Sequence, residues 1–172
     1  MTEDRTAFEI DGRVYVSAGV MFYTIDKDNG IHFLLQELPP ERTGRRLEDF
    51  GGKSNRDDTS IEDVAFRECQ EELNFANGID TPFLKKYLDS DMSYVYRIPE
   101  NKYVLYLIHL PIEFKTSLDL AAFGKKEIHC DVVRKVRWIT YYDMMQGFRS
   151  LHPRLKPEEF RNNLPLILCG AF

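Results

Sequence analysis

The dipeptide Asn29-Gly30 separates two apolar runs and is the feature that most constrains how this chain can fold. The runs cover Ser17 to Ile25 and Ile31 to Leu38. Asn-Gly favours a type I′ turn, in which both central residues adopt a positive φ, and this turn joins antiparallel strands. We therefore expect a strand, a tight turn and a second strand in this part of the chain.

Strands and helices alternate along the rest of the sequence. Ser93 to Ile98 and Lys102 to Leu110 flank Pro99-Glu100-Asn101 and predict a second hairpin, rich in Tyr and Val. Val132 to Ile139 predicts a further strand. Hairpins are too frequent for a purely parallel sheet, so we expect an α/β sandwich with a mixed β-sheet.

Two helices are predicted near the C-terminus. Thr140-x-x-Asp143 is a capping pattern for a short helix, and Pro157 suits the first turn of a final helix. Pro165 should interrupt or kink that helix. The segment from Pro39 to Arg46 has charges and helix breakers without an apolar period, which predicts an exposed loop.

Length and composition limit the classes of protein. The chain has 172 residues, 43% of them hydrophobic, which predicts a single domain over residues 1–172. Lys and Arg number 23 against 28 Asp and Glu, giving a net charge of −5. This excludes nucleic-acid binding through bulk charge, but it does not exclude binding through local basic patches.

The cysteines and the apolar runs point to an intracellular protein. Cys69, Cys130 and Cys169 form no C-x-x-C motif, so neither a disulfide framework nor a zinc ribbon is expected. The N-terminus has no apolar region of the signal-peptide type, and the stretch from Tyr103 to Ile112 is too short to span a bilayer. We expect a soluble cytoplasmic protein without membrane contact.

A helix with one acidic face is predicted over Ile61 to Leu73. Thr59-x-x-Glu62 and Ser60-x-x-Asp63 are both capping boxes for its start, and Asn74 suits its end. A rotation of 100° per residue puts Ala65, Cys69 and Leu73 on a packing face. The same rotation puts Glu68, Glu71 and Glu72 on an adjoining face.

The three carboxylates have two interpretations. They are a solvated acidic face with Arg67 as counter-charge, or they bind a hard divalent cation, which prefers oxygen ligands. The preceding Gly51-Gly52 favours the cation, because paired glycines in a turn let the backbone approach a ligand. Lys53 adds a positive charge there.

These residues resemble the Nudix box, G-x5-E-x7-R-E-U-x-E-E-x-G-U with U apolar. The core R-E-U-x-E-E is matched in full from Arg67 to Glu72, and Phe75 fills the last apolar position. Two features depart from the pattern. Gly52 and Arg67 are one residue further apart than in the family, so Asp58, or next Asp57, is the nearest counterpart of the first acid. Asn74 replaces the glycine near the end.

The resemblance implies a Nudix-like α/β/α sandwich and a metal-dependent pyrophosphohydrolase. Its substrate would be a diphosphate linkage in a nucleoside diphosphate derivative: a nucleotide, a nucleotide sugar, a dinucleoside polyphosphate or capped RNA. Water would attack at phosphorus with Mg²⁺ or Mn²⁺ as cofactor. The implied metal ligands are Glu68, Glu72 and the Gly52 carbonyl. Glu71 would either bind the metal directly or contact its ligands. Arg67 would hold the acidic face through Glu71.

Further residues are candidates for catalysis or substrate binding. The general base in this family is a box glutamate or an acid from a distant loop; Glu127 is the candidate outside the box, and a solvated loop acid is the alternative. Arg45, Arg46 and Lys53 are candidates for phosphate binding, and Tyr94 for stacking on a base. The four histidines show no ligand spacing and are expected to be structural.

Two other functions stay open. One is a catalytically silent Nudix-fold module that binds a nucleotide or RNA, favoured by the altered first half of the box. The other is a diphosphoinositol polyphosphate hydrolase, whose basic rim would come from Lys85-Lys86 and Lys125-Lys126. Nudix proteins are often dimers, so a homodimer is also open, although no segment requires it.

Overall fold

The structure is a computed structural model, and it describes residues 5–38, 46–73, 81–88, 93–118, 120, 134–147 and 150–170. The strands are β1 (Phe8–Ile10), β2 (Arg13–Tyr15), β3 (Ser17–Ile25), β4 (Ile31–Leu38), β5 (Arg46–Glu48), β6 (Phe50–Lys53), β7 (Ser93–Ile98), β8 (Tyr103–His109) and β9 (Lys135–Thr140). The α-helices are α2 (Ile61–Leu73), α3 (Thr81–Leu88), α4 (Glu113–Ser117), α5 (Tyr141–Gln146) and α6 (Glu158–Gly170). Short 3₁₀ helices lie at η1 (Pro99–Asn101) and η3 (Pro153–Leu155).

A seven-stranded mixed sheet forms the centre of the protein. Its main order is β5-β4-β3-β8-β7, with β6 paired to β3 and β9 paired to β4. β3 and β8 run parallel, and the other pairs are antiparallel. The prediction of a mixed sheet is therefore confirmed. β1 and β2 form a separate two-stranded hairpin.

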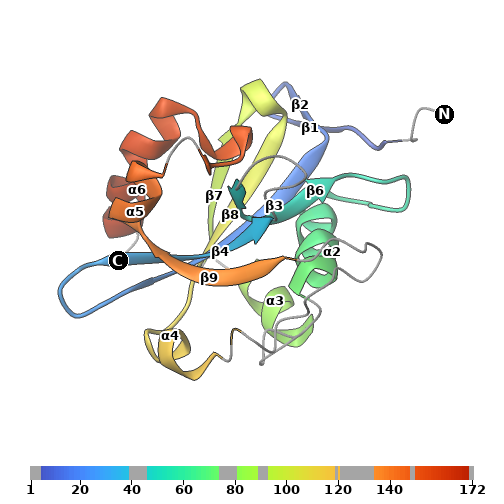
Figure 1. Cartoon of the computed structure of the whole chain (residues 1–172). Coiled ribbons are helices and arrows are strands. Elements are labelled where there is room, and N and C mark those ends of the chain that lie inside the picture. The colour runs from blue at the N-terminus through green and yellow to red at the C-terminus, as the bar shows by residue number, and fades with distance from the viewer. Residues whose placement is uncertain are drawn as a thin grey trace.

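Helices cover both faces of this sheet (Figure 1). Successive side chains of a strand point to opposite faces, and β3 shows the consequence. Val20 and Phe22 pack in one core cluster with residues of α2 and α3. Met21 and Tyr23 pack in a second cluster with residues of α5 and α6. The protein is thus an α/β/α sandwich with two apolar layers.

The hairpin between β3 and β4 forms as predicted, but its turn is of another kind. Ile25 pairs with Ile31, so five residues lie between the strands. The Asn29 N–H donates to the Asp26 carbonyl, and Asn29 alone in this turn has a positive φ, of 61°. The Asp26 carboxylate accepts hydrogen bonds from the Asp28 and Gly30 amides. A side chain therefore closes the turn, and the type I′ prediction is wrong.

The predicted N-terminal caps of α2 and α5 agree with the structure. The Ser60 hydroxyl accepts a hydrogen bond from the Asp63 amide, and the Asp63 carboxylate accepts one from the Thr59 amide. Thr140 accepts a hydrogen bond from the Asp143 amide at the start of α5. Of the two outcomes predicted at Pro165, the interruption is wrong, since α6 continues to Gly170, and the kink stays a prediction.

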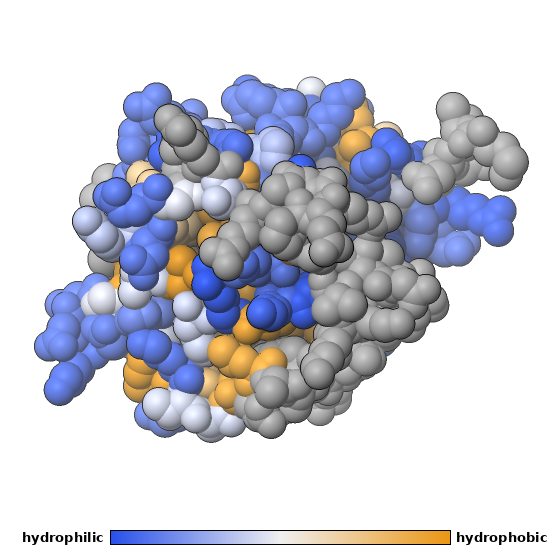
Figure 2. All heavy atoms as spheres, viewed as in Figure 1, coloured by the Kyte–Doolittle hydropathy of each residue, from blue (hydrophilic) through white to orange (hydrophobic). Residues whose placement is uncertain are grey.

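Hydrophilic side chains cover much of the surface in Figure 2, with smaller apolar patches between them. In the part of the chain that the structure describes, no helix has both the length and the apolarity needed to cross a membrane.

Candidate functional site

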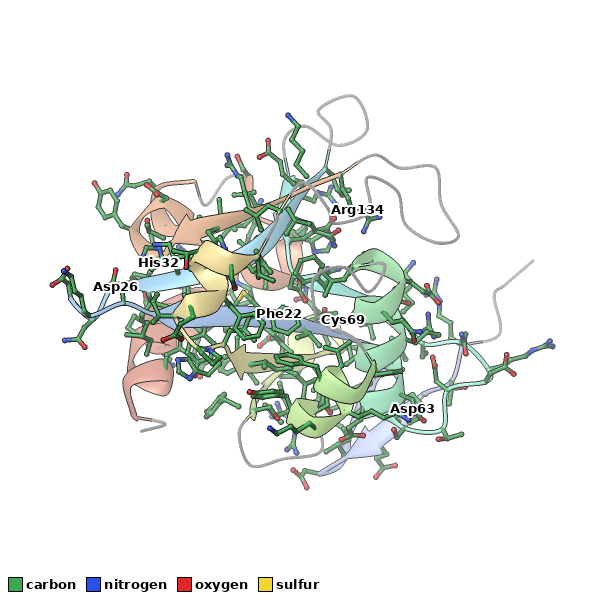
Figure 3. The ribbon with its side chains drawn as sticks, turned by 90° about the horizontal axis from the view of Figure 1, so that it is seen from below. Phe22, Asp26, His32, Asp63, Cys69 and Arg134 are labelled. Atoms are coloured by element: carbon green, nitrogen blue, oxygen red, sulfur yellow. The ribbon has the colours of Figure 1, made fainter. Side chains whose placement is uncertain are left out.

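Helix α2 lies against β3 and β6 and anchors the candidate site. Ala65, Cys69 and Leu73 are fully buried, as the helical rotation predicts. Figure 3 shows Cys69 near Phe22 of β3, inside the core on this face of the sheet. The packing face fixes the rotation of the helix, and this rotation determines where the three glutamates point.

Gly51 and Gly52 lie in strand β6 and not in a turn, so the predicted turn is wrong. Gly51 pairs with Gly19 and Gly52 pairs with Ala18 of β3. A methyl group on Gly52 would clash with Oε2 of Glu68. Only glycine leaves room for this carboxylate directly above the strand. The group that lies close to this glycine is the carboxylate of Glu68, and the expected approach of a ligand to the backbone stays a prediction.

Arg67 ties the start of the site together. Its Nε and Nη2 atoms donate to the two oxygens of Asp58 at 3.0 and 2.9 Å, and Nη2 also donates to the Lys53 carbonyl at 2.8 Å. Its Nη1 lies 2.8 Å from Glu68 Oε1 and 3.5 Å from Glu71 Oε1. Burial lowers the pKa of Arg67, but Asp58 and Glu68 raise it by a larger amount, so the net pKa is above its usual value.

The Arg67–Glu71 ion pair expected from the sequence is present, although it is the longest of the three Arg67 ion pairs. The shorter contacts join Arg67 to Asp58 and Glu68. Asp58 thus fills the position facing this arginine, in spite of the extra residue in the box. The two glutamates converge on a single cationic nitrogen, and both side chains are less than one-fifth exposed.

Glu72 points into the protein. Its Oε2 accepts hydrogen bonds from the Gly51 amide and the Gln36 side chain, both at 2.7 Å. Its Oε1 lies 3.1 Å from Nη1 of Arg134, which precedes β9 and is labelled in Figure 3. Burial raises the pKa of Glu72 well above its usual value, and Arg134 opposes that shift.

A second buried ion pair lies behind β6. Arg154 of η3 donates through Nε to Asp49 at 2.6 Å, and through Nη2 to the Asp49 and Gly51 carbonyls at 3.1 and 3.2 Å. Tyr103 donates to the other Asp49 oxygen. The Asp49 carbonyl also accepts a hydrogen bond from Gln36. Arg154 is therefore connected to Glu72 through Asp49 and Gln36, and through the backbone of Gly51.

The other predicted residues lie around this centre or away from it. Lys53 ends β6, where its side chain is exposed. Arg46 is the first residue of β5, so it lies in a strand and not in the predicted loop. Tyr94 lies on β7, at the opposite edge of the sheet from β5. Arg45, Asn74, Phe75 and Glu127 lie outside the described residues.

Four residues of this centre are not indicated by any pattern in the sequence: Gln36, Asp49, Arg134 and Arg154. Within the described segments, no group of three or more His, Cys, Asp or Glu side chains is arranged to hold a metal ion.

Comparison with known proteins identifies the fold. No protein-family model and no curated protein sequence matches the chain. Solved structures do match it. The Nudix hydrolase RenU from M. smegmatis is 14% identical with a TM-score of 0.50, and the match covers 95% of each chain. An Ap4A hydrolase from C. elegans, in a binary complex, is 13% identical with a TM-score of 0.51, covering 90% of this chain and 97% of that one. This chain therefore has the Nudix fold.

Proposed function

We propose that this protein is a divalent-metal-dependent pyrophosphohydrolase that cleaves a diphosphate linkage in a nucleoside diphosphate derivative. The observation that carries the proposal is the convergence of Glu68 and Glu71 on one cationic nitrogen, beside a glycine that leaves space for the Glu68 carboxylate. The Nudix fold and the R-E-U-x-E-E pattern support it. The neighbour from C. elegans is an Ap4A hydrolase, so dinucleoside polyphosphates belong among the substrates to be tested.

The donor set suits a hard cation. Mg²⁺ takes carboxylate and carbonyl oxygens and is often held by one or two carboxylates together with the substrate phosphates. Glu68 and Glu71 supply two such carboxylates, and the Gly52 carbonyl and Glu72 are the proposed further ligands. A bound Mg²⁺ or Mn²⁺ would screen the phosphate charge and lower the pKa of an attacking water.

The chain's own residues would position the reactants. Arg67, held by Asp58, keeps Glu68 and Glu71 at one side of β6. Lys53 at the exposed end of β6, with Arg45 and Arg46, is proposed to bind substrate phosphates. Tyr94 is proposed to stack on a base, which requires the substrate to extend to β7. Glu127 is the proposed general base outside the box, and the alternative is a box glutamate.

Hydrolysis is tested with Mg²⁺ or Mn²⁺ and a panel of nucleotides, nucleotide sugars, dinucleoside polyphosphates, ADP-ribose, capped RNA and diphosphoinositol polyphosphates. Wild type should release phosphate-bearing products from at least one of them. Glu68→Gln and Glu72→Gln should lower turnover by at least about a hundredfold, or about 2.7 kcal/mol. Glu62→Gln, at the other end of the same helix, is the control and should retain turnover.

A binding module without catalysis is the second candidate, and the position of Glu72 favours it. The Gly51 amide, the Gln36 side chain and Arg134 already supply hydrogen bonds and a positive charge to this carboxylate, so a metal ion is not required to stabilise it. Folded wild type that binds a member of the same panel in calorimetry, but releases no product from any of them, would support this module and contradict the hydrolase.

A further inference from the structure

Arg134 lies against the carboxylate of Glu72, which the proposed function assigns to the metal ion. Its Nη1 lies 3.1 Å from Glu72 Oε1 and donates to Gln36 Oε1 at 2.5 Å. Gln36 in turn donates to Glu72 Oε2 at 2.7 Å. The three side chains form a closed ring, and Arg134 and Glu72 are 3% and 9% exposed.

A buried carboxylate needs a compensating positive charge, because isolated charges are strongly disfavoured away from water. In this structure Arg134 supplies that charge to Glu72. A divalent cation bound by the same carboxylate would bring two further positive charges close to the guanidinium. Their repulsion is poorly screened, since solvent hardly reaches the pair.

We infer that Arg134 is a positioning residue that holds Glu72 through Gln36 and competes with the divalent cation for its carboxylate, thereby setting the metal affinity of the site. The inference rests on the proposed function, because it takes Glu72 to be a metal ligand. This role differs from a purely structural one in the direction in which metal affinity changes when Arg134 is removed. Loss of a structural ion pair weakens the site, whereas loss of a competitor strengthens metal binding.

The test uses Mn²⁺ alone, with its free concentration measured by electron paramagnetic resonance. Arg134→Gln keeps polar donors near Gln36 and Glu72 but removes the charge. It should bind Mn²⁺ at least about tenfold more tightly than wild type, or about 1.4 kcal/mol. Arg134→Lys keeps the charge on a single-point donor and should lie between the two. Arg137→Gln is the control: Arg137 is on β9, half exposed and paired with Glu37 at 3.0 Å, and its loss should leave the affinity unchanged.

Thermal unfolding supplies a readout independent of affinity. In EDTA, Arg134→Gln should melt below wild type, because Glu72 is left buried without its partner. Mn²⁺ should raise its melting temperature by more than it raises that of wild type. If Arg134→Gln does not fold, Arg134→Lys alone decides, and it should bind Mn²⁺ more tightly than wild type.

Other outcomes would overturn the inference. These are equal or weaker Mn²⁺ binding by the Arg134 variants, an affinity gain that persists when Glu72→Gln is added, or no Mn²⁺ binding by any form. The failure of the proposed function is separate, because turnover is measured on the same samples. If Arg134→Gln binds Mn²⁺ most tightly, Arg134→Lys next and wild type least, but no form has turnover, the competition by Arg134 stands and the hydrolase is rejected. If wild type has turnover and binds Mn²⁺ most tightly, the hydrolase stands and the competition is rejected.

Discussion

The guanidinium of Arg67 donates hydrogen bonds to both carboxylate oxygens of Asp58, with Nε 3.0 Å from Oδ1 and Nη2 2.9 Å from Oδ2. Asp58 also accepts a hydrogen bond from the Asn55 amide at 2.7 Å, so the loop before α2 is fixed to the helix. A two-point ion pair with little solvent access is stronger than a surface contact. It holds the arginine that faces Glu68 and Glu71.

Asp58→Asn should therefore lower the free energy of unfolding by about 1–3 kcal/mol, because the charged partner of Arg67 is lost in a partly buried site. Turnover should fall with it, since Arg67 is no longer fixed beside the glutamates. Asp57→Asn is a matched control: its side chain is 85% exposed and lies 3.9 Å from Arg56, so its effect should stay within about 0.5 kcal/mol. Urea unfolding measures both variants, and equal losses would show that Asp58 has no special role.

The two glycines of β6 should respond differently to alanine. At Gly52 the added methyl group meets the carboxylate of Glu68, which is the end of a flexible side chain. Gly52→Ala should cost about 1–3 kcal/mol of stability while displacing Glu68, so that turnover and Mn²⁺ affinity fall at least about tenfold. Turnover equal to that of wild type would show that the position of Glu68 above β6 is not needed.

At Gly51 the methyl group would lie 2.6 Å from the Ala18 carbonyl oxygen and from the Gly19 Cα, which belong to the backbone of β3. Backbone atoms of a central strand cannot turn aside. Gly51→Ala should therefore destabilise the protein more than Gly52→Ala does, by over about 3 kcal/mol in urea unfolding. A smaller loss for Gly51→Ala than for Gly52→Ala would contradict this account of the strand pairing.

The buried Arg154–Asp49 pair should matter far more than an exposed one. Arg154→Met leaves the Asp49 carboxylate without its charged partner and should cost about 3–5 kcal/mol. Arg97→Met removes an ion pair with Asp11 whose side chains are 43% and 78% exposed, and it should cost less than about 1 kcal/mol. Chemical denaturation of the two variants provides the comparison. Similar losses would mean that Arg154 contributes no more than a surface residue.

Local patterns predicted those parts of the site that depend on neighbouring residues. The bounds of α2 follow from Ser60, Asp63 and an apolar period, all within one segment. The ion pair between Arg67 and Glu71 follows from their i, i+4 spacing. By contrast, helical rotation places Glu72 on the acidic face, at its border with the packing face, and only the partners of its carboxylate turn it inward.

Those partners are distant in the sequence and carry no local signal. Gln36 is 36 residues from Glu72, and Arg154 is 105 residues from Asp49. Neither Gln36 in an apolar strand nor Arg154 beside Pro153 has a spacing that indicates a polar network. The sheet topology brings them together, and a single sequence does not determine that topology. The turn of the first hairpin was mispredicted because the Asp26 carboxylate, and not the Asn-Gly propensity, determines it.

Acid sensitivity should depend on His152. Its Nδ1 accepts a hydrogen bond from the Arg154 amide at 3.2 Å, which an imidazolium cannot do, and its Nε2 lies 3.8 Å from Glu48. Burial, followed by the positive charges of Arg154, Arg46 and Lys156, lowers the pKa of His152 to about 3. Burial raises the pKa of the facing Glu48 above its usual value, and Arg154 opposes that shift.

The unfolded chain binds a proton at His152 below about pH 6.5, whereas the folded protein does so only near pH 3. The free energy of unfolding should therefore fall as the pH drops through this window. The loss attributable to His152 at pH 5.5 is about 1 kcal/mol after allowance for solvent screening of the partly exposed ring. His152→Asn keeps a cap acceptor without a titrating group and should lose less stability between pH 7.5 and 5.5 in urea unfolding. Parallel pH profiles would rule out His152, and a steeper loss in the variant would show that Glu48 stabilises the imidazolium.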